Sequence, residues 1–369
     1  MRSTGAPKVL HVVGSLEGGG AERWVRELAP RLVERGIDTE IATVYDPRLD
    51  EDELRALRCT VHYRPKRRGF DPAHFVWLSR LIAQRSPAVV HTHQWSGKYV
   101  GRSAALVARA KRVVHTEHSP TLLGRWERLM AEALWRQTEA VIAFTPDNAR
   151  LIAAREPVRT FEIIRNGLPL PERPTPGVRA AARARIGAPR DTVVFGVVAS
   201  LQERKNHILA LEALSLLPRG GTPVRLDIFG DGPLRNELMR RAVALGVADR
   251  VVFHGFRPDV RDLLPGVDVF MTVALHEIAP VSILEAMAVC LPVIGTPHPG
   301  TLEMVEDGVT GAVAGWDAQS VADAMLLARD GAQWRARCGD GGRLRVERDY
   351  DIERIADQHA AFYRRVART

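Results

Sequence analysis

Two patterns of hydrophobic and polar positions alternate along this chain of 369 residues. Short apolar runs rich in β-branched residues predict strands, and the amphipathic stretches between them predict helices. The predicted strands are residues 8–15, 39–46, 88–94, 112–118, 140–145 and 161–167 in the first half, and 193–200, 224–232, 250–256, 267–273 and 292–297 in the second half. This alternation of strands and helices is typical of parallel α/β sheets.

The clearest predicted helices in the first half are residues 21–36 and 124–137. In the second half, proline suits the first turn of a helix, because its missing N–H would have had no partner there. Helices are predicted to begin near Asn206, Pro233, Pro258 and Pro280.

A proline-rich stretch without periodicity, LPLPERPTPG at residues 168–177, interrupts the alternation, which then restarts. A chain of this length exceeds one comfortable hydrophobic core. We therefore expect two doubly wound α/β domains, residues 1–167 and 179–345, joined by a linker at 168–178. Open parallel sheets bind ligands at the carboxyl ends of their strands, so the cleft between the domains is the expected site.

The composition, with 46% hydrophobic and 26% charged residues, is that of a soluble globular protein. No apolar run is long enough to cross a bilayer, and the N-terminus runs into the first predicted strand without a secretory signal. We therefore expect a cytoplasmic protein. The three cysteines, Cys59, Cys290 and Cys338, show no CxxC spacing and indicate neither a disulfide framework nor a zinc site.

The net charge of +8 favours anionic partners, such as nucleic acid, phosphate-bearing ligands or an acidic membrane face. Much of the excess is arginine scattered over helices, and we interpret the one dense cluster, RPKRRGF at residues 64–70, as a solvated loop rather than a nucleic-acid site. Trp24, Trp95 and Trp126 would suit peripheral docking at the inner membrane face if exposed, although we favour packing in the core or the cleft for each of them.

Three segments that follow predicted strands carry candidate phosphate-binding residues. Gly18, Gly19 and Gly20 precede the first helix, where a glycine run lets the backbone approach a ligand at the helix N-terminus. Arg204 and Lys205 head a helix in the second half, where cations oppose the helix dipole and require an anion nearby. A tight turn and two exposed basic residues are the simpler interpretations of these segments.

The third segment is GDG at residues 230–232, with Asp231 between two glycines. These residues also suit any turn from a strand to a helix.

Histidines gather at the ends of two predicted strands. His91 and His93 share one face of their strand, but no carboxylate or cysteine cluster completes a metal site, and we expect no metal. His118 closes the next strand and is directed toward the crevice, where it could orient or polarise a substrate. A structural histidine is the alternative.

Two glutamates flank the start of a predicted helix at residues 281–289. Glu277 lies in the preceding loop, and Glu285 lies inside the apolar helix, where an unpaired carboxylate would cost several kcal/mol. Glu285 therefore needs a hydrogen-bond donor. The hydroxyls of a ribose are one candidate, and an internal partner such as Lys205 or a backbone N–H is the other.

Together these motifs resemble the large family of retaining GT-B glycosyltransferases, which includes mannosyl-, glucosyl- and N-acetylglucosaminyltransferases. The resemblance spans nearly the whole chain and is most specific in the second half. It rests on GGGAE at 18–22, RNG at 165–167, RKN at 204–206, GDGP at 230–233, Glu277 and Glu285 separated by seven residues, PVIGTP at 292–297 followed by GxxEMVEDGxTG at 300–311, and YDIERIADQHAAFYRRV at 350–366.

The resemblance implies the GT-B architecture, in which two Rossmann-like domains face each other across a cleft and a final helix, within residues 346–369, packs back toward the first domain. It implies a nucleotide-sugar donor held mainly by the second domain and an acceptor on the first domain. The acceptor is left open among lipid-linked sugars, growing surface polysaccharides and small metabolites. Retaining members are thought to use front-face substitution, in which the donor phosphate helps to remove the acceptor proton. Neither a protein nucleophile, a metal nor a cofactor is then required, because cations and helix dipoles stabilise the leaving group.

The same resemblance implies roles for single residues. Glu285 would hold the ribose, Glu277 would contact the transferred sugar, and His118 would lie beside the reacting sugar. Arg204 and Lys205 would neutralise the diphosphate leaving group.

Glycines of the first domain would approach the diphosphate from the opposite side, and several positions of the second domain would contact the donor. Ser200 stands where family members often carry arginine, and Ile278 stands where glycine often follows the first glutamate, so both departures bear on donor identity. The implied donor-binding residues are Gly19, Gly20, Ser200, Gly230, Asp231, Ile278, Ala279, Val281 and Glu285.

Three other functions remain open. A sugar-nucleotide epimerase on the same fold would use Glu277 and His118 as acid and base. A non-catalytic sugar-nucleotide-binding subunit is compatible with Ser200. An NAD-dependent oxidoreductase is disfavoured, because the GxGxxG motif with an acidic residue about twenty positions further on is missing.

Overall fold

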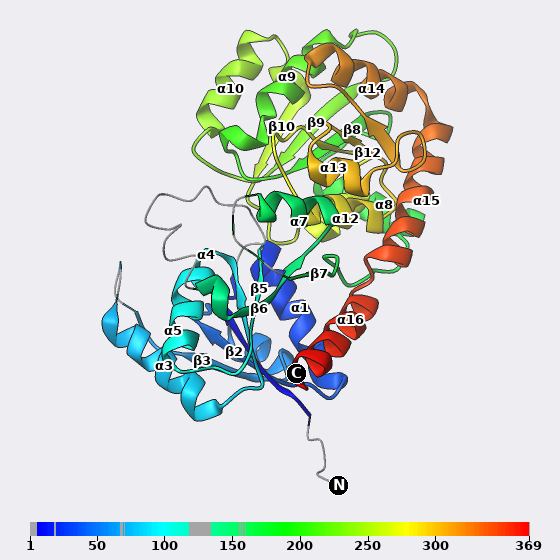
Figure 1. Cartoon of the computed structure of the whole chain (residues 1–369). Coiled ribbons are helices and arrows are strands. Elements are labelled where there is room, and N and C mark those ends of the chain that lie inside the picture. Colours follow the sequence, from blue (N-terminus) through cyan, green and yellow to red (C-terminus); the bar gives the residue numbers. More distant parts are fainter. Residues whose placement is uncertain are drawn as a thin grey trace. The chain divides into compact units, whose positions relative to one another are not determined.

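The computed structural model describes residues 6–17, 20–66, 69, 71–117, 134–154, 156, 158 and 160–368 (Figure 1). The chain forms two compact units. The first unit comprises Met1–Pro169 and Asp351–Thr369, and the second unit comprises Leu170–Tyr350. Each unit is a parallel α/β structure and is described by itself.

The first unit is built on a seven-stranded parallel sheet among its described residues, with strand order β3-β2-β1-β4-β5-β6-β7. Strand β1 is an interior strand that pairs with β2 on one side and with β4 on the other, so the chain winds outward in both directions from β1. Its strands are β1 (Lys8–Val13), β2 (Asp38–Thr43), β3 (Thr60–Tyr63), β4 (Val89–His93), β5 (Val113–Thr116), β6 (Thr138–Ala143) and β7 (Phe161–Ile163).

Helices cover the two faces of this sheet. They are α1 (Gly20–Glu34), α2 (Glu51–Ala56), α3 (Pro72–Arg85), α4 (Gln94–Ser96), the π-helix η1 (Gly97–Gly101), α5 (Arg102–Val107), α7 (Pro146–Ala153) and α16 (Ile352–Val366).

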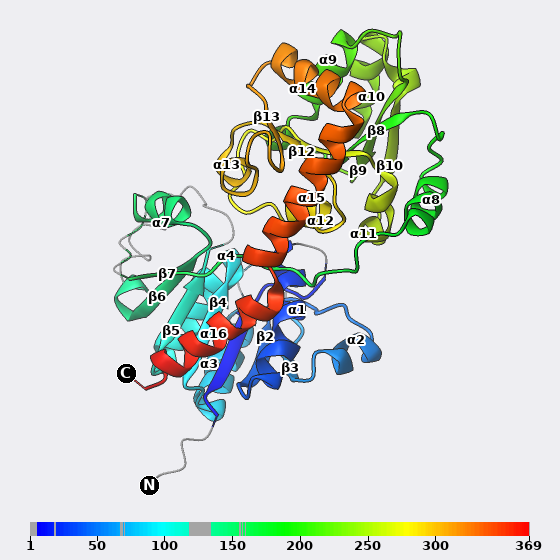
Figure 2. The same cartoon turned by 90° about the vertical axis from the view of Figure 1, so that its right-hand side faces the viewer.

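Helix α16 completes the core of the first unit although it follows the whole second unit in the sequence. Figure 2 shows it, in red, alongside α1 and the first sheet. Ile355, Ala356 and Tyr363 of α16 are buried in one cluster with Val9 of β1 and Leu28 of α1. These side chains are fully or almost fully withdrawn from water, so α16 and α1 together cover this face of the first sheet.

The second unit is built on a six-stranded parallel sheet with strand order β10-β9-β8-β11-β12-β13. This is the order 3-2-1-4-5-6 of doubly wound nucleotide-binding folds, with its switch point between β8 and β11. Its strands are β8 (Val193–Val198), β9 (Val224–Phe229), β10 (Val251–Gly255), β11 (Val269–Thr272), β12 (Val293–Gly295) and β13 (Gly311–Val313).

The helix starts predicted near Asn206, Pro233, Pro258 and Pro280 are each matched within two residues, and the helical segments of the second unit number eleven. They are α8 (Pro176–Arg185), η2 (Glu203–Lys205), α9 (His207–Leu216), α10 (Arg235–Ala244), η3 (Ala248–Arg250), α11 (Val260–Leu263), η4 (Leu264–Gly266), α12 (Val281–Ala288), α13 (Pro299–Met304), α14 (Ala318–Asp330) and α15 (Ala332–Asp349).

All eleven predicted strands are present, and the predicted α/β class with two parallel sheets is confirmed. The sequence did not predict β3 and β13, because β3 is a short edge strand without a buried residue and β13 has only three residues, one of them glycine. Most of the helix predicted at residues 124–137 lies outside the described residues.

The tryptophans considered for membrane docking differ in their exposure to solvent. Trp24 is buried and packs in the core, whereas half of the surface of Trp95 is exposed, and Trp126 lies outside the described residues. Trp24 therefore cannot contact a membrane. Within the described part of the chain, no helix combines the length and apolar character that a bilayer crossing requires.

Candidate functional site

The switch point of the second sheet brings two loops together. Strands β8 and β11 are neighbours, and because they run parallel, the segments that follow them leave from the same edge of the sheet. Residues 199–206 follow β8, and residues 273–280 follow β11. The backbone N–H of Leu275 donates to the carbonyl oxygen of Arg204 at 2.9 Å and joins the two loops. These loops contain three of the nine predicted donor-binding residues, Ser200, Ile278 and Ala279, and also Arg204, Lys205 and Glu277.

Two cations and one carboxylate meet at this edge. The Nζ of Lys205 lies 2.5 Å from Oε1 of Glu277, and a guanidinium nitrogen of Arg204 lies 2.7 Å from the same oxygen. Lys205 and Glu277 are mostly buried, whereas Arg204 is exposed. The anion that we inferred beside the two cations is thus partly supplied by the protein itself. One positive charge remains in excess, which suits a site for phosphate groups.

The local backbone explains how the cations reach Glu277. Arg204 and Lys205 lie in the short 3₁₀ turn η2, and Asn206 follows in the left-handed conformation, with φ of 51°. Asparagine adopts this conformation at lower cost than most residues. The chain then turns into α9, so the two basic side chains project from the turn before the helix.

The loop carrying Glu277 is held against the start of α13. The backbone N–H of Gly300 donates to the carbonyl oxygen of Glu277 at 2.8 Å. A Cβ atom at Gly300 would lie 2.4 Å from Cδ of Pro280, so no other residue fits here without movement of the loop. Close packing at Gly300 therefore fixes the position of Glu277.

His298 is a buried residue of this region that the sequence analysis did not single out. Its Nδ1 accepts a hydrogen bond from the N–H of Thr301 at 3.1 Å and caps α13. Burial lowers its pKa to about 4, and the charge of Lys205 acts in the same direction against the opposing effect of Glu277. The ring is therefore neutral near pH 7, and besides capping α13 its Nε2 contacts the hydroxyls of Thr301 at 3.0 Å and of Thr272 in β11 at 3.4 Å.

Glu285 has an internal partner that the sequence did not reveal. It lies in α12 and is 7% exposed, and its Oε1 accepts a hydrogen bond from Nε of Arg261 at 2.7 Å. Arg261 belongs to α11, and Lys205, the internal partner named from the sequence, contacts Glu277 instead. An internal partner was one of the two alternatives left open for Glu285, and in the structure that partner is Arg261. A carboxylate offers about four acceptor positions, so the contact with Arg261 is compatible with further hydrogen bonds.

The GDG turn has a strict steric reason for its glycines. Gly230 has φ of 147°, and a Cβ atom there would lie 2.0 Å from the carbonyl oxygen of Ala199. The N–H of Leu201 donates to the carbonyl oxygen of Asp231 at 3.0 Å, so this turn packs directly on the loop after β8. Gly230 shapes that loop, and the side chain of Asp231 is exposed.

The other predicted donor-binding residues of the second unit lie at the same edge. Ser200, the second residue after β8, is half-buried. In the loop after β11, Ile278 is buried and Ala279 is half-buried. Val281 opens α12, and Pro280 at the N-cap position supplies no side-chain cap among the described residues. The N–H of Ile283 donates to the carbonyl oxygen of Pro280 at 3.1 Å, so the N–H groups of Val281 and Ser282 are the ones available for a ligand anion.

The predicted residues of the first unit are only partly described. Gly18, Gly19 and His118 lie outside the described residues, whereas Gly20 opens α1 and is exposed. At the switch point between β1 and β4, Nε2 of Gln94 donates to Glu22 of α1 at 2.9 Å. The carboxyl edge of this sheet also carries polar groups.

A third histidine joins the His91 and His93 pair. His11 of β1 lies opposite His91 of β4, and the three buried rings bring ligand-type nitrogens within 4.8 Å of one another. The ring nitrogens of His91 contact Tyr363 and Thr116 at 2.6 and 2.7 Å, and those of His11 and His93 lie 3.0 Å apart. The sequence did not reveal His11 because strand pairing alone brings it there.

These contacts describe a hydrogen-bonded histidine cluster in which His91 already uses both ring nitrogens. Burial is the main cause that lowers the pKa of His11 to about 3, so its ring is neutral near pH 7. A metal would have to displace the partners of His91 before all three rings could bind it.

The sequence also did not reveal a buried ion cluster at the end of β5. Lys98, in the π-helix η1, is fully buried, and its Nζ contacts Glu117 at 2.8 Å and also Glu156. Burial raises the pKa of Glu117, but His115 and Lys98 outweigh it and lower the pKa to about 2. These contacts hold Glu117, the residue that directly precedes His118 in the sequence, in place.

The sequence matches two glycosyltransferase families that together cover most of the chain. Residues 178–345 match the family described as glycosyl transferases group 1, and residues 18–171 match Glycosyltransferase Family 4. The chain therefore belongs to this group of glycosyltransferases, as the motifs of the sequence indicated.

Curated relatives and solved structures agree with this assignment. The chain is 28% identical over 301 residues to the putative glycosyltransferase EpsF of Bacillus subtilis, with 78% of each chain covered. It is 30% identical over 226 residues to the lipopolysaccharide core glycosyltransferase LpsE of Rhizobium meliloti, covering 61% of this chain and 64% of the relative.

Among solved structures, HepE of Anabaena in complex with UDP and glucose superposes with a TM-score of 0.85 at 22% identity, covering 97% of this chain and 100% of HepE. The lipopolysaccharide glycosyltransferase WaaG superposes with a TM-score of 0.76 at 18% identity, covering 96% of this chain and 99% of WaaG. The predicted GT-B fold is confirmed.

Proposed function

We propose that this glycosyltransferase moves a hexosyl group from a nucleoside-diphosphate sugar to a hydroxyl acceptor with retention of configuration and without a resident metal. The observation that carries the proposal is the cluster of Arg204, Lys205 and Glu277 at the carboxyl edge of β8 and β11. Its excess positive charge lies beside the uncapped N-terminus of α12, and both features favour a diphosphate.

The names of related proteins support the donor class. HepE was solved with UDP-glucose, and an Escherichia coli relative, 27% identical over 242 residues with 61% of each chain covered, is named as a galactosyltransferase that uses UDP-galactose. We propose a nucleotide sugar of this kind for the present chain.

In the proposed reaction, an acceptor oxygen forms a bond to the anomeric carbon while the bond between that carbon and the phosphate oxygen breaks. The acceptor proton passes to the leaving phosphate on the same face of the sugar. Lys205 and Arg204 stabilise the charge that develops on the diphosphate, as preorganised cations do in other enzymes. Glu277 orients both cations and contacts the sugar, and His118 lies beside the reacting carbon.

Glu285 is proposed to hold the ribose of the donor. Its contact with Arg261 orients the carboxylate within α12, so it needs no rearrangement to accept hydrogen bonds from two neighbouring hydroxyls. Gly19, Gly20, Ser200, Gly230, Asp231, Ile278, Ala279 and Val281 complete the proposed donor site.

For the acceptor we propose a sugar hydroxyl on a growing polysaccharide or a lipid-linked sugar. LpsE is named for lipopolysaccharide core biosynthesis, and the Escherichia coli relative is named for a diphosphoundecaprenol acceptor. A lipid-linked acceptor would bring the protein to the cytoplasmic face of a membrane, at least transiently.

The test combines donor binding with product analysis. A panel of nucleotide sugars is screened by thermal shift, because a bound donor raises apparent stability by mass action. The donor that binds is then incubated with lipid-linked and polysaccharide acceptors, and the anomeric configuration of the product is determined by NMR. Replacing Lys205 with alanine should lower kcat by about 10²-fold or more, the usual effect of removing a stabilising donor from a transition state.

Replacing Arg240 with alanine is the matched control, because Arg240 is exposed on α10 of the same unit. Equal loss of activity in both variants would contradict the role of Lys205. An isomerised sugar nucleotide formed without acceptor would favour an epimerase, and donor binding without transfer to any acceptor would favour a non-catalytic subunit.

A further inference from the structure

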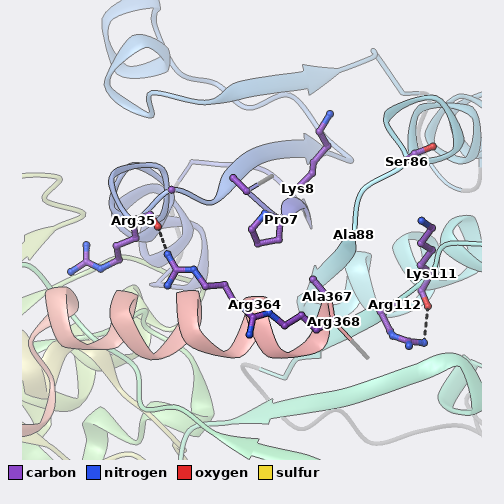
Figure 3. A pocket seen from close by; sticks show the side chains of 12 residues that line it. Pro7, Lys8, Arg35, Ser86, Ala88, Lys111, Arg112, Arg364, Ala367 and Arg368 are labelled. Atoms are coloured by element: carbon purple, nitrogen blue, oxygen red, sulfur yellow. Dashed lines mark hydrogen bonds between the residues drawn. The ribbon is translucent and has the colours of Figure 1, made fainter. Parts of the chain in front are cut away.

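The first unit contains a basic pocket that the proposed function does not use. It has a volume of about 1010 Å³ and is shown in Figure 3. Six of its twelve lining residues are lysine or arginine, and none of the twelve is acidic. The lining residues are Ala6, Pro7, Lys8, Arg35, Gly36, Ser86, Ala88, Lys111, Arg112, Arg364, Ala367 and Arg368.

This pocket lies at the amino edge of the first sheet. Lys8 is the first residue of β1, Ala88 directly precedes β4, and Lys111 and Arg112 directly precede β5. Since the strands are parallel, their amino ends meet at one edge, and the loops that carry Gly20 and Gln94 leave from the opposite edge. The basic pocket is therefore separated from the carboxyl edge, where this fold class binds its substrates, by the length of the strands.

Three of the six cations are balanced within the protein. Lys8 lies 3.5 Å from Glu40, Arg35 lies 2.6 Å from Asp357, and Arg112 lies 3.8 Å from Glu139. These pairs account for the presence of their basic residues in the pocket wall without any ligand.

The other three cations, Lys111, Arg364 and Arg368, are exposed and have no carboxylate within ion-pair distance among the described residues. The guanidinium of Arg364 donates to the backbone carbonyl of Arg35, which fixes its position in the wall but leaves its charge uncompensated (Figure 3). Like charges brought together in this way repel one another unless an anion is bound.

Helix stability explains only part of this arrangement. Arg364 and Arg368 lie at the C-terminal end of α16, where cations interact favourably with the helix dipole. Lys111 and Arg112 come from the turn before β5 and have no such function. Two segments far apart in the sequence thus contribute cations to the same concave surface (Figure 3).

We propose that this pocket binds an anion with several phosphate groups. Lysine and arginine are the side chains that recognise phosphate, through charge-assisted hydrogen bonds. No aromatic ring is present among the lining residues, so the pocket lacks the stacking surface that a nucleic-acid base requires. The same chemistry suits a soluble polyphosphorylated molecule or the phosphate headgroups of an anionic lipid surface. The proposal does not depend on the proposed transfer reaction.

The test uses inorganic tripolyphosphate as the soluble probe and the full chain as the protein. Calorimetric titration should show one site, and the double variant Lys111→Ser/Arg368→Ser should raise its Kd at least tenfold. All titrations are repeated with Lys205→Ala, so that binding at the candidate active site does not contribute. The control, Arg240→Ser/Arg354→Ser, removes the same charge from exposed residues outside the pocket and should leave the Kd unchanged.

Flotation with phosphatidylcholine vesicles, with and without phosphatidylglycerol, distinguishes the two sources. The pocket is assigned to a lipid surface if three results are obtained together. The wild type binds the anionic vesicles, tripolyphosphate displaces it from them, and the pocket variant, unlike the control variant, no longer binds them. Tripolyphosphate binding without vesicle binding assigns it to a soluble molecule. If the pocket variant binds both probes as the wild type does, or if the wild type binds neither, the proposal is wrong. Melting curves establish that both double variants are folded.

Discussion

Among single residues, Glu277 controls the charge of the candidate site. Its carboxylate contacts both Lys205 and Arg204, so one negative charge opposes two positive charges. A site that binds a diphosphate and then releases it must not hold the product too tightly. Glu277 lowers the positive charge that the proposed diphosphate would meet, and it keeps the two cations in place.

Replacing Glu277 with glutamine should therefore have opposite effects on product binding and on turnover. The excess charge rises, so the nucleoside diphosphate should bind roughly fivefold more tightly, because a charge pair in water is worth about 1 kcal/mol. The rate should fall, since the cations lose their orienting partner. Product inhibition constants and kcat measure the two effects separately, and a variant with weaker product binding would contradict this charge balance.

The contact of Glu285 with Arg261 allows the contribution of Glu285 to folding stability to be measured separately from its proposed role in donor binding. Replacing Arg261 with leucine leaves a buried carboxylate without this partner and should lower the free energy of unfolding by about 1–3 kcal/mol. The loss is smaller than for a fully buried ion pair, because Arg261 is partly exposed to water. Urea denaturation measures this loss. The double variant Arg261→Leu/Glu285→Leu should regain most of the stability, because both charges are removed together.

Donor binding should not return in that double variant if Glu285 holds the ribose. Thermal shift with the nucleotide sugar provides this readout. A double variant that recovers both stability and donor binding would show that Glu285 is only the partner of Arg261.

Several single residues of the site could be predicted from the sequence, and others could not. Arg204 and Lys205 were singled out as cations at the head of a helix, and Glu277 as a residue of the loop before another helix. Their roles at one donor site came from the resemblance to the glycosyltransferase family, and the structure brings the three side chains into contact. Arg261 and His298 were not predicted, since their roles depend on which side chains the folded chain brings close to them. A buried glutamate in an apolar helix indicates that a partner exists, but the sequence does not say which residue it is.

At the level of elements, close contacts between loops determine the shape of the candidate site. The turn after β9 packs on the loop after β8 through Gly230, and the loop after β11 packs on α13 through Gly300. These contacts place the cations and Glu277 at one edge of the second sheet. Glycine is required because the backbones approach more closely than a Cβ atom permits.

Replacing Gly230 with alanine should destabilise the second unit more than most single substitutions. The new Cβ atom would overlap the carbonyl oxygen of Ala199, and φ of 147° is unfavourable for any other residue. We expect a loss of about 2–4 kcal/mol, because strained backbone and overpacking act together. Urea denaturation and donor binding should both report the change.

Gly220 provides the matched control, because a Cβ atom there would have no neighbour within 4 Å and its φ is ordinary. Replacing it with alanine should change stability by about 0.5 kcal/mol or less. Similar losses in both variants would contradict the steric explanation.

The regular elements were more predictable than their packing. Strands such as β1 and β8 have continuous apolar patterns that identify them from the sequence alone. The pairing of β1 with β4 placed His11 beside His91, and no local pattern contains that information. The short edge strand β3 lacks buried residues, so its sequence resembles that of a loop.

In the whole molecule, buried neutral histidines make stability sensitive to acid. Burial is the main cause that lowers the pKa of His11 to about 3 and the pKa values of His115, His207, His298 and His359 to about 4. In the unfolded chain these rings would take up protons near their ordinary pKa of 6.5. Protonation therefore favours unfolding, and the stability present above pH 6.5 should be lost progressively toward pH 4.

Urea denaturation at several pH values between 7 and 4 measures this slope. Replacing His359 with glutamine removes one of the titrating groups and should make the slope shallower, whereas replacing the exposed His276 with glutamine should not. A stability that stays constant from pH 7 to pH 4.5 would contradict the prediction.

The position of α16 has a consequence for how this protein is made. The first unit needs residues 351–369 to complete its core, but the ribosome synthesises residues 170–350 before them. The second unit can therefore fold during translation, while one apolar face of the first sheet is covered only in part, by α1. During this interval the nascent chain is most exposed to chaperones and proteases, and a premature stop before α16 would leave the first half of the chain without a lasting native state.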